Sequence, residues 1–331
     1  ANWAPEHHIL MTKLFAKDSS AGPGAGGDDH PLIVVGIGAS AGGVEALQAL
    51  FRAMPEPPAA MAFVVVTHLG VGHESALPAI LGDCAAMPVH AARNGDVVAP
   101  GRTYVLPHDA VITIADGRLV LRPQAEGQPR ERQPIDLFLA SLALDQRERA
   151  VGIVLSGTGS DGTLGLKAIK EQAGLTIAQG SNAAGPRYPE MPASAVAGGA
   201  VDLVLMVEDM PARLAELTAV PGAAARTQAA VVADSAREAA RAAICAILRV
   251  HVGHDFAGYK APTFFRRVQR RMQVLRLPHL DAYVAHLQSS SEEAGLLFRD
   301  LLIGVTGFFR DADAFAALAG LVIPALLDGR G

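Results

Sequence analysis

Three polar side chains in this sequence are of the types that a nucleophilic hydrolase needs, and each follows a short apolar run. Ser40 lies in a glycine-rich stretch, His68 comes directly after the apolar run 62–67, and Asp161 follows the run 151–155. A serine attacks a carbonyl carbon when a base takes its proton and a carboxylate orients that base. The set therefore predicts a serine hydrolase. Its chain order, Ser, His, Asp, differs from that of α/β-hydrolases and disfavours a lipase-like enzyme.

The glycine-rich stretch around Ser40 supports two interpretations. The pattern Gly36-x-Gly38-x-x-Ala41 matches a dinucleotide-binding loop, in which glycines let the backbone approach a pyrophosphate. The pattern Gly38-x-Ser40-x-Gly42 matches a nucleophile elbow, a sharp strand-to-helix turn that exposes the serine. A dinucleotide site needs an acidic residue at the end of the next strand, and His68 occupies that place. This favours the hydrolase, while a plain small-residue turn beside a structural histidine stays open.

Neighbouring residues offer alternative roles for these side chains and additional hydrogen-bond donors. His73 lies close to His68 in the sequence and is a rival for the role of base. Asp161 precedes a predicted helix, so its carboxylate can cap that helix instead of orienting an imidazole. The glycines of both loops allow backbone amides to face the site. The N–H groups of Ala41 and Thr158 are therefore candidate donors to an oxyanion.

Apolar runs that alternate with helical periodicity must position these residues. The predicted strands cover 32–38, 62–67, 151–155, 176–178 and 203–206, and the predicted helices cover 44–54, 74–81, 136–144 and 164–171. This alternation predicts an α/β fold with a doubly wound, mostly parallel sheet and helices on both faces. Asp116-Gly117 between two apolar runs predicts an inserted hairpin. Sites in such sheets lie at the carboxyl ends of strands, where the three candidate residues fall.

The composition divides the chain into four segments. We expect a flexible tail over 1–29, in which the residues before Met11 suggest an expression remnant, and an α/β domain over 30–217. Pro221-Gly222 and the alanines that follow indicate a linker over 218–234. From 235 to 331 every segment has helical periodicity, which predicts a small all-α domain.

Composition also limits the class of protein. Half of the 331 residues are hydrophobic, which is enough for a core and excludes a wholly disordered chain. A net charge of -5 and an aromatic content of 5% argue against a nucleic-acid-binding protein. Cys84 and Cys245 form no metal-binding or disulfide pattern, so we expect no metal site and a reducing, cytoplasmic location. We expect neither a signal peptide nor a membrane-spanning segment.

Several ordered motifs resemble the catalytic domain of the bacterial chemotaxis protein-glutamate methylesterase. They are Ile37-Gly38-Ala39-Ser40-Ala41-Gly42-Gly43, Thr67-His68, Tyr104-Val105-Leu106-Pro107-His108-Asp109, Arg132-Gln133-Pro134-Ile135-Asp136, Ser156-Gly157-Thr158-Gly159-Ser160-Asp161-Gly162 and Met191-Pro192-x-Ser194-Ala195. The resemblance implies hydrolysis of glutamyl methyl esters on the cytoplasmic helices of chemoreceptors, with release of methanol and often deamidation of receptor glutamines. Ser40 is then the nucleophile, His68 the base and acid, and Asp161 its orienting residue. No cofactor is implied for the esterase.

This sequence departs from the family in two places. The family commonly carries a phosphorylatable receiver domain before the catalytic one, and only a short segment precedes it here, so we expect no regulation by aspartyl phosphorylation within this chain. The usual Met-Pro-Arg-Ser is Met-Pro-Ala-Ser at 191–194. Arg187 is a candidate for the missing basic role.

The helical segment is similar to the N-terminal helical domain of the chemotaxis receptor methyltransferase. The similarity lies in the stretches 253–260, 266–272 and 298–311. In that family a Thr and an Arg of the last stretch contact S-adenosylmethionine, which implies Thr306 and Arg310 here. The chain ends at Gly331 without the Gly-rich strand-turn-helix that holds most of this cofactor, so we expect no methyl transfer. S-adenosylmethionine would be a cofactor only if the missing transferase domain were present.

An arginine-rich helix of this segment is the candidate docking surface for a receptor. A buried stripe is predicted from apolar residues at helical spacing, namely Phe265, Val268, Met272 and Leu275. The remaining face then carries Arg266, Arg267, Arg270 and Arg271. An ordinary solvated charged face is one interpretation, and docking onto the glutamate-rich helices of a receptor is the other.

Two main classes of function stay open at this point. The first is a receptor methylesterase tethered to a receptor-docking helical domain. The second is a non-catalytic chemosensory scaffold that binds receptors or other chemosensory signalling proteins and keeps a vestigial triad. A nucleotide-binding oxidoreductase is a third and weaker possibility. Methanol release that depends on Ser40 separates the first class from the others.

Overall fold

The computed structural model describes residues 32–56, 60–68, 76–108, 110–124, 131–182, 185–218 and 230–302. Within them, the main sheet has seven strands in the order β3-β4-β2-β1-β7-β8-β9, and all neighbouring strands run parallel. They are β1 (Ile33–Ala39), β2 (Met61–Thr67), β3 (Val89–Ala91), β4 (Thr103–Val105), β7 (Ala150–Val154), β8 (Leu175–Gln179) and β9 (Leu203–Leu205). The predicted α/β class with a doubly wound parallel sheet is confirmed.

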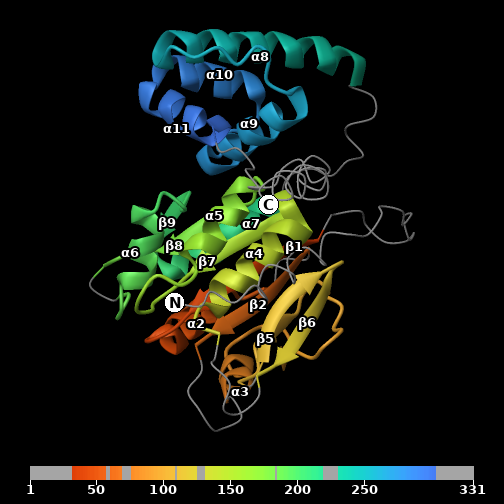
Figure 1. Ribbon diagram of the computed structural model, residues 1–331, viewed down its shortest axis with the longest axis vertical. Helices are drawn as coiled ribbons and strands as arrows, with labels where there is room; N and C mark the ends of the chain where they lie inside the picture. Colours follow the sequence, from red (N-terminus) through yellow and green to blue (C-terminus); the bar gives the residue numbers. More distant parts are fainter. Residues whose placement is uncertain are drawn as a thin grey trace, which may run out of the picture. The chain divides into compact units, whose positions relative to one another are not determined.

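Helices cover both faces of this sheet. One face carries α4 (Pro134–Gln146), α5 (Thr163–Glu171) and α6 (Glu190–Ala197), and α4 and α5 lie side by side across the strands (Figure 1). The other face carries α2 (Gly43–Arg52), α3 (Leu77–Gly82) and α7 (Met210–Thr218). Successive side chains of a strand point to opposite faces, so β1 contributes Val34 to the first core and Val35 to the second. Burial on both faces explains why the strands are continuous apolar runs.

The predicted hairpin forms outside the main sheet. β5 (Ala110–Ala115) pairs antiparallel with β6 (Arg118–Pro123) in a separate two-stranded ribbon (Figure 1). Asp116 and Gly117 have φ values of 52° and 69°, which is the conformation of a two-residue type I′ turn. Ser141 Oγ of α4 accepts the N–H of Ile114 at 3.1 Å, and Asp145 of α4 accepts the N–H of Gly117 at 3.2 Å. These bonds hold the hairpin against α4.

Four elements of the α/β region are missing from the sequence-based expectations. β3 and β4 have three residues each and include His90 and Thr103, so no continuous apolar run marks them. α6 and α7 each contain a proline near their start, Pro192 and Pro211. Sequence patterns treat proline as a break, although the first turn of a helix tolerates it.

Residues 230–302 are mostly helical, as predicted. They contain α8 (Ala230–Val252), α9 (Ala261–Leu275), α10 (Leu280–Ser289) and α11 (Ser291–Leu302). These helices build their own core around Ile244, Phe264, Val268 and Tyr283. In the part of the chain that the structure describes, no helix is both long enough and apolar enough to cross a membrane. The predicted domain boundaries stay predictions.

The predicted exposed arginine face of α9 is wrong for three of its four members. Arg267, Arg270 and Arg271 are each at most 5% exposed, whereas Arg266 is exposed. Arg271 donates to the Glu293 carboxylate in a buried ion pair with distances of 2.9 and 2.6 Å. Buried guanidinium groups are stable only when carboxylates or carbonyl groups satisfy them, and here they do.

Arg270 and Arg267 find their partners mostly outside the helical region. Arg270 donates to the carbonyl oxygen of Gly174 at 3.0 Å, to Asp300 of α11 at 2.7 Å, and to Asp202 before β9. Arg267 donates at 2.7 and 2.6 Å to two carbonyl oxygens at the end of α5, where helical carbonyls lack partners within the helix. Side chains expected to meet the acids of a receptor therefore already meet acids and carbonyl groups of this chain.

Truncation of Phe138 tests the α4-facing core. Phe138 is fully buried between α4 and the sheet, so Phe138→Ala is expected to lower the free energy of unfolding by about 3–5 kcal/mol. Leu144 of the same helix is 53% exposed, and Leu144→Ala should change it by no more than about 0.5 kcal/mol. Urea denaturation followed by circular dichroism measures both values. Equal losses in the two variants would contradict this packing.

Arg270 and Arg266 form a second matched pair of variants. Arg270→Ala leaves Asp202 and Asp300 buried without their common partner, so we expect a loss of about 3–5 kcal/mol in the free energy of unfolding. Arg266→Ala removes an exposed side chain and should cost less than about 0.5 kcal/mol. Thermal and urea denaturation of the full chain decide the point. A stable Arg270→Ala variant would restore the view that this arginine is solvated.

Candidate functional site

Ser40 lies in a sharp turn between β1 and α2. Its N–H donates to the carbonyl oxygen of Ser156 at 2.9 Å, which ties the turn to the loop after the neighbouring strand β7. Gly42, the N-cap of α2, has φ of 69°, a conformation that favours glycine. A Cβ atom at this position would also lie 2.8 Å from Ser156 Oγ. The strand-turn-helix geometry is the one expected of a nucleophile elbow.

The structure brings Ser40, His68 and Asp161 together. His68 follows β2, which pairs with β1. Ser40 Oγ lies 3.2 Å from His68 Nδ1, and His68 Nε2 lies 2.7 Å from Asp161 Oδ2. Because a carboxylate accepts hydrogen bonds, this network assigns the ring proton to Nε2 and the lone pair to Nδ1, facing the hydroxyl. An imidazole in this tautomer is ready to take the proton of Ser40.

Asp161 is held by three backbone N–H groups. Its Oδ1 accepts the N–H groups of Asp136 at 2.8 Å and Gly162 at 2.9 Å, and its Oδ2 accepts that of Ile135 at 3.1 Å. Ile135 and Asp136 belong to the first turn of α4, whose N–H groups have no partner within the helix. Gly162 is the N-cap of α5. The carboxylate of Asp161 therefore caps α4, the helix before it in sequence, and not the helix that it precedes.

Asp136 of α4 makes a similar hydrogen bond in the opposite direction, to the first turn of α5. Its Oδ1 accepts the N–H of Gly165 at 2.7 Å, while its own N–H donates to Asp161. Asp136 is 7% exposed, and its Oδ2 has no hydrogen-bond partner among the described residues. Burial raises the pKa of Asp136 above its ordinary value; the N–H of Gly165 opposes this rise, and the charge of Asp161 adds to it. The sequence analysis contains Asp136 within a motif and gives it no role.

The predicted oxyanion donors lie on the two loops that the Ser40–Ser156 hydrogen bond joins. Neither Ala41 N–H nor Thr158 N–H donates to any acceptor within the described ranges. The N–H of Ser40 itself is already used by Ser156. α2 begins beside this turn, and the start of a helix carries a partial positive charge. Both features suit a negative charge next to Ser40, and the roles of Ala41 and Thr158 stay predictions.

Ser156 is a structural residue of the site that the sequence analysis missed. It is 1% exposed, and its Oγ donates to the carbonyl oxygen of Ala41 at 2.9 Å and accepts the N–H of Tyr188 at 3.1 Å. Its N–H donates to Gln179 Oε1 at 2.9 Å. Ser156 thereby links the Ser40 turn to β8 and to the loop before α6. The available signals were its place directly after an apolar strand and at the start of the motif 156–162, to which the sequence analysis gave no structural role.

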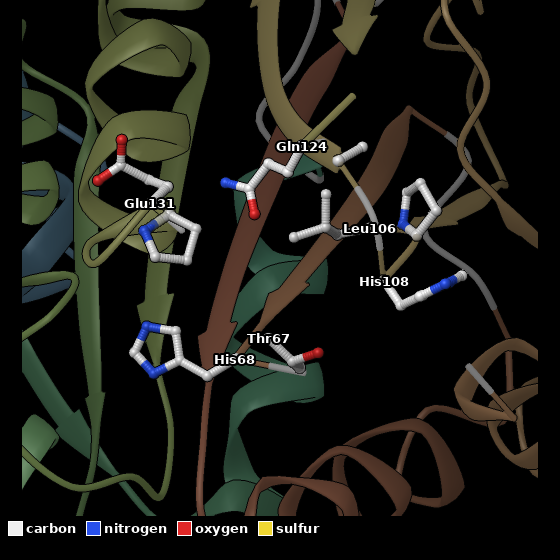
Figure 2. A pocket seen from close by; sticks show the side chains of 9 residues that line it. Thr67, His68, Leu106, His108, Gln124 and Glu131 are labelled. Atoms are coloured by element: carbon white, nitrogen blue, oxygen red, sulfur yellow. The ribbon is translucent and has the colours of Figure 1, made fainter. Parts of the chain in front are cut away.

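A small hollow of about 60 Å³, open to solvent, lies beside His68. It is lined by Thr67, His68, Leu106, Pro107, His108, Ala110, Gln124, Glu131 and Pro134. Figure 2 shows His68 and Glu131 on one side of this hollow and Leu106 and His108 on the other. The hydroxyl of Thr67 is buried and has no hydrogen-bond partner in the described structure. His68 therefore borders a hollow that is open to solvent.

A second hollow, of about 120 Å³ and also open to solvent, lies between the start of α2 and the ends of β8 and β9. Its polar lining includes Glu45, Gln179, Asn182 and Arg187. Arg187, the candidate for the missing basic role, is exposed, and its guanidinium lies 5.8 Å from the ring centroid of Tyr188. A basic side chain therefore lines a hollow next to the Ser40 turn, and its role stays a prediction.

Some candidate residues lie outside the described residues. These are the two predicted S-adenosylmethionine contacts, Thr306 and Arg310, and the rival base His73. In the ranges that the structure describes, no group of three or more His, Cys, Asp or Glu side chains is placed to hold a metal ion.

The raised pKa of Asp136 predicts a measurable pH dependence of stability. The folded protein holds this proton more tightly than the unfolded chain does. The stability that Asp136 contributes is therefore complete below its ordinary pKa of 3.8 and is lost as the pH rises through the raised value. Asp136→Asn removes the titration and can still accept the N–H of Gly165. Its stability relative to the natural chain should improve from about pH 4 to about pH 7 in urea denaturation, and a constant difference would contradict this.

Two family models match this chain, one over the α/β region and one over the helical region. The family model described as CheB methylesterase matches residues 35–214, which is more than half of the chain and includes Ser40, His68 and Asp161. The model described as CheR methyltransferase, all-alpha domain, matches residues 240–302. The first match covers nearly all of the parallel sheet and its helices, and the second covers α9, α10, α11 and most of α8.

Similar proteins include both enzymes and a larger chain. A Rhodobacter capsulatus protein named "Uncharacterized 104.1 kDa protein in hypE 3'region" is 35% identical over 264 residues, which are 73% of this chain and 27% of that protein. Protein-glutamate methylesterase/protein-glutamine glutaminase 3 of Paramagnetospirillum magneticum is 34% identical over 188 residues, or 56% of this chain and 51% of the relative. The Moorella thermoacetica enzyme of that name is 36% identical over 191 residues, with 56% and 44% covered. The chain spans about half or less of the length of these curated relatives.

A solved structure shares the fold of the α/β region. The crystal structure of the Thermotoga maritima CheB methylesterase catalytic domain aligns with a TM-score of 0.50 and 26% sequence identity. The alignment covers 57% of this chain and 100% of that one. Together with the match of the family model over residues 35–214, this shows that the chain belongs to the CheB methylesterase family.

Proposed function

We propose that this chain hydrolyses glutamyl methyl esters on chemoreceptors and releases methanol. The observation that carries the proposal is the hydrogen-bonded series Ser40 Oγ, His68 and Asp161 at the carboxyl ends of parallel strands. Membership of the CheB methylesterase family supplies the substrate class. Because several relatives are named protein-glutamate methylesterase/protein-glutamine glutaminase, the proposal extends to the deamidation of receptor glutamines.

In the proposed reaction, Ser40 attacks the ester. His68 Nδ1 takes the hydroxyl proton while Oγ forms a bond to the carbonyl carbon, and the carbonyl oxygen becomes an oxyanion. The N–H groups of Ala41 and Thr158 donate to this oxygen, and the start of α2 adds a favourable field. The Asp161 carboxylate accepts a hydrogen bond from Nε2–H throughout and stabilises the imidazolium.

The tetrahedral intermediate then loses the methoxy group. The carbon–oxygen bond to that group breaks, His68 Nδ1–H donates its proton to the leaving oxygen, and methanol departs from a glutamyl-Ser40 ester. Water attacks this ester with His68 as the base, which releases the glutamate carboxylate and restores Ser40. With a glutamine substrate, ammonia leaves in place of methanol. We assign the hollow beside His68 as the path for methanol and water (Figure 2).

The proposal places the receptor helix across the carboxyl ends of β1, β2 and β7, and gives the helical region a part in docking. The match to the all-alpha domain of CheR methyltransferases supports that part. Arg266 is the exposed member of the predicted arginine set, so it is the one available to an acidic receptor surface. The proposed location is the cytoplasm, where the signalling helices of chemoreceptors lie.

Substitution of Ser40 tests the reaction directly. Ser40→Ala removes the nucleophile and should lower the rate of methanol release from methylated receptor by roughly 10³-fold or more. Ser181 is an exposed serine at the same edge of the sheet, and Ser181→Ala should keep the full rate. Methanol is quantified after incubation of receptor-containing membranes with each purified chain, and circular dichroism confirms that the variants fold.

The other outcomes of this assay discriminate between functions. A Ser40→Ala variant that retains most of the rate would mean that another residue is the nucleophile. If the natural chain binds receptor and releases neither methanol nor ammonia, the non-catalytic scaffold becomes the better description.

A further inference from the structure

The starts of α4 and α5 exchange hydrogen bonds through two carboxyl groups. Asp161, just before α5, accepts N–H groups from the first turn of α4, including that of Asp136 at 2.8 Å. Asp136, in that first turn, accepts the N–H of Gly165 in α5 at 2.7 Å. The two helix starts are thus joined in both directions. A shift of α5 away from α4 would strain these bonds, and Asp161 makes two of them.

The fit between the two helices leaves little room at this place. A Cβ atom on Gly165 would lie 2.5 Å from Leu139 Cβ and 3.1 Å from the backbone of Asp136. Asp161 lies in the segment between β7 and α5, so its position depends on where α5 begins. The side chain of Asp136 holds this beginning on α4 through its hydrogen bond with the N–H of Gly165.

We propose that Asp136 is a positioning residue of the catalytic site, whose carboxyl group holds the start of α5 on α4 and so keeps Asp161 within hydrogen-bond reach of His68. Asp136 makes no recorded hydrogen bond with Ser40 or His68, so it acts through Asp161. The inference rests on the proposed function only where methanol release is the readout.

Burial and the nearby charge of Asp161 raise the pKa of Asp136, which favours the neutral form of its carboxyl group. Its Oδ2 is buried without a hydrogen-bond partner among the described residues, and the charge of Asp161 is near. Two buried carboxylates that share one site do not both ionise readily. An amide of the same shape should therefore replace Asp136, whereas a side chain without an acceptor, or one of a different length, should not.

The test compares variants of the full chain. Asp136→Ala is expected to lower kcat for methylated receptor by about 10²-fold, because a displacement near 1 Å at a catalytic group has that effect, and to leave KM unchanged. Asp136→Asn is expected to keep most of the natural kcat. Asp136→Glu, with its longer side chain, is expected to behave like Asp136→Ala and serves if that variant does not fold.

A double variant separates positioning from general stability. If Asp136 acts through Asp161, the chain with both Asp136→Ala and Asp161→Ala should be no slower than the chain with Asp161→Ala alone. Asp145→Ala is the matched control, because Asp145 of α4 also accepts a backbone N–H from another element, that of Gly117, but lies at the other end of the helix. It should cost stability and leave kcat unchanged. Additive losses in the double variant, or equal losses of kcat in the Asn and Ala variants, would overturn the proposal.

A spectroscopic readout keeps this inference distinct from the proposed function. Nitrogen-15 NMR of labelled histidine reports which ring nitrogen of His68 carries the proton. The natural chain and Asp136→Asn should show a protonated, hydrogen-bonded Nε2, and Asp136→Ala and Asp161→Ala should lose that signature. If no chain releases methanol but this pattern holds, the proposed function fails and the positioning role stands. If Asp136→Ala keeps the natural spectrum, the positioning role is wrong.

Discussion

The site depends on one interaction, the contact of the buried Asp161 carboxylate with four donors. Three are backbone N–H groups, two of them from the first turn of α4, and the fourth is His68 Nε2. A buried carboxylate is costly unless donors such as these surround it. They are available because α4 begins where β1 and β7 end, a geometry that the parallel sheet and its helices impose. The same contact fixes the tautomer and the direction of the imidazole.

The sequence alone indicated much of this site, for a definable reason. Ser40, His68 and Asp161 each follow an apolar run, and the ends of parallel strands meet at one edge of a sheet. The supporting contacts were not predictable in the same way. Ser156 bonds to Ala41 and Tyr188, and Asp136 bonds to Gly165, so their partners lie far away in the sequence. These hydrogen bonds become visible only when the structure shows which loops and helix starts lie next to one another.

The error on α9 has a related cause. Helical periodicity identifies the apolar stripe of a helix, but it does not say what covers the remaining face. Arg270 and Arg271 are covered by acidic residues of other elements, and Arg267 by carbonyl groups at the end of α5. The guanidinium groups are therefore part of the interior, and their number in the sequence overstates the charge that a partner protein would meet.

The order of the strands explains which ring nitrogen of His68 faces which neighbour. His68 follows β2, Ser40 follows the adjacent strand β1, and Asp161 comes after β7, one strand further on. Neighbouring strands lie about 4.8 Å apart, so the serine is near the backbone of the histidine and the aspartate is roughly twice as far. Of the two ring nitrogens, Nδ1 is closer to the backbone, at about the distance of the side-chain amide of an asparagine. Nε2 lies farther out, at about the distance of the side-chain amide of a glutamine. The spacing of the strands therefore matches the nearer ring nitrogen to the serine and the farther one to the aspartate. If the histidine strand lay between the other two, the serine and the aspartate would be equally far from it, and this spacing would not assign the two ring nitrogens.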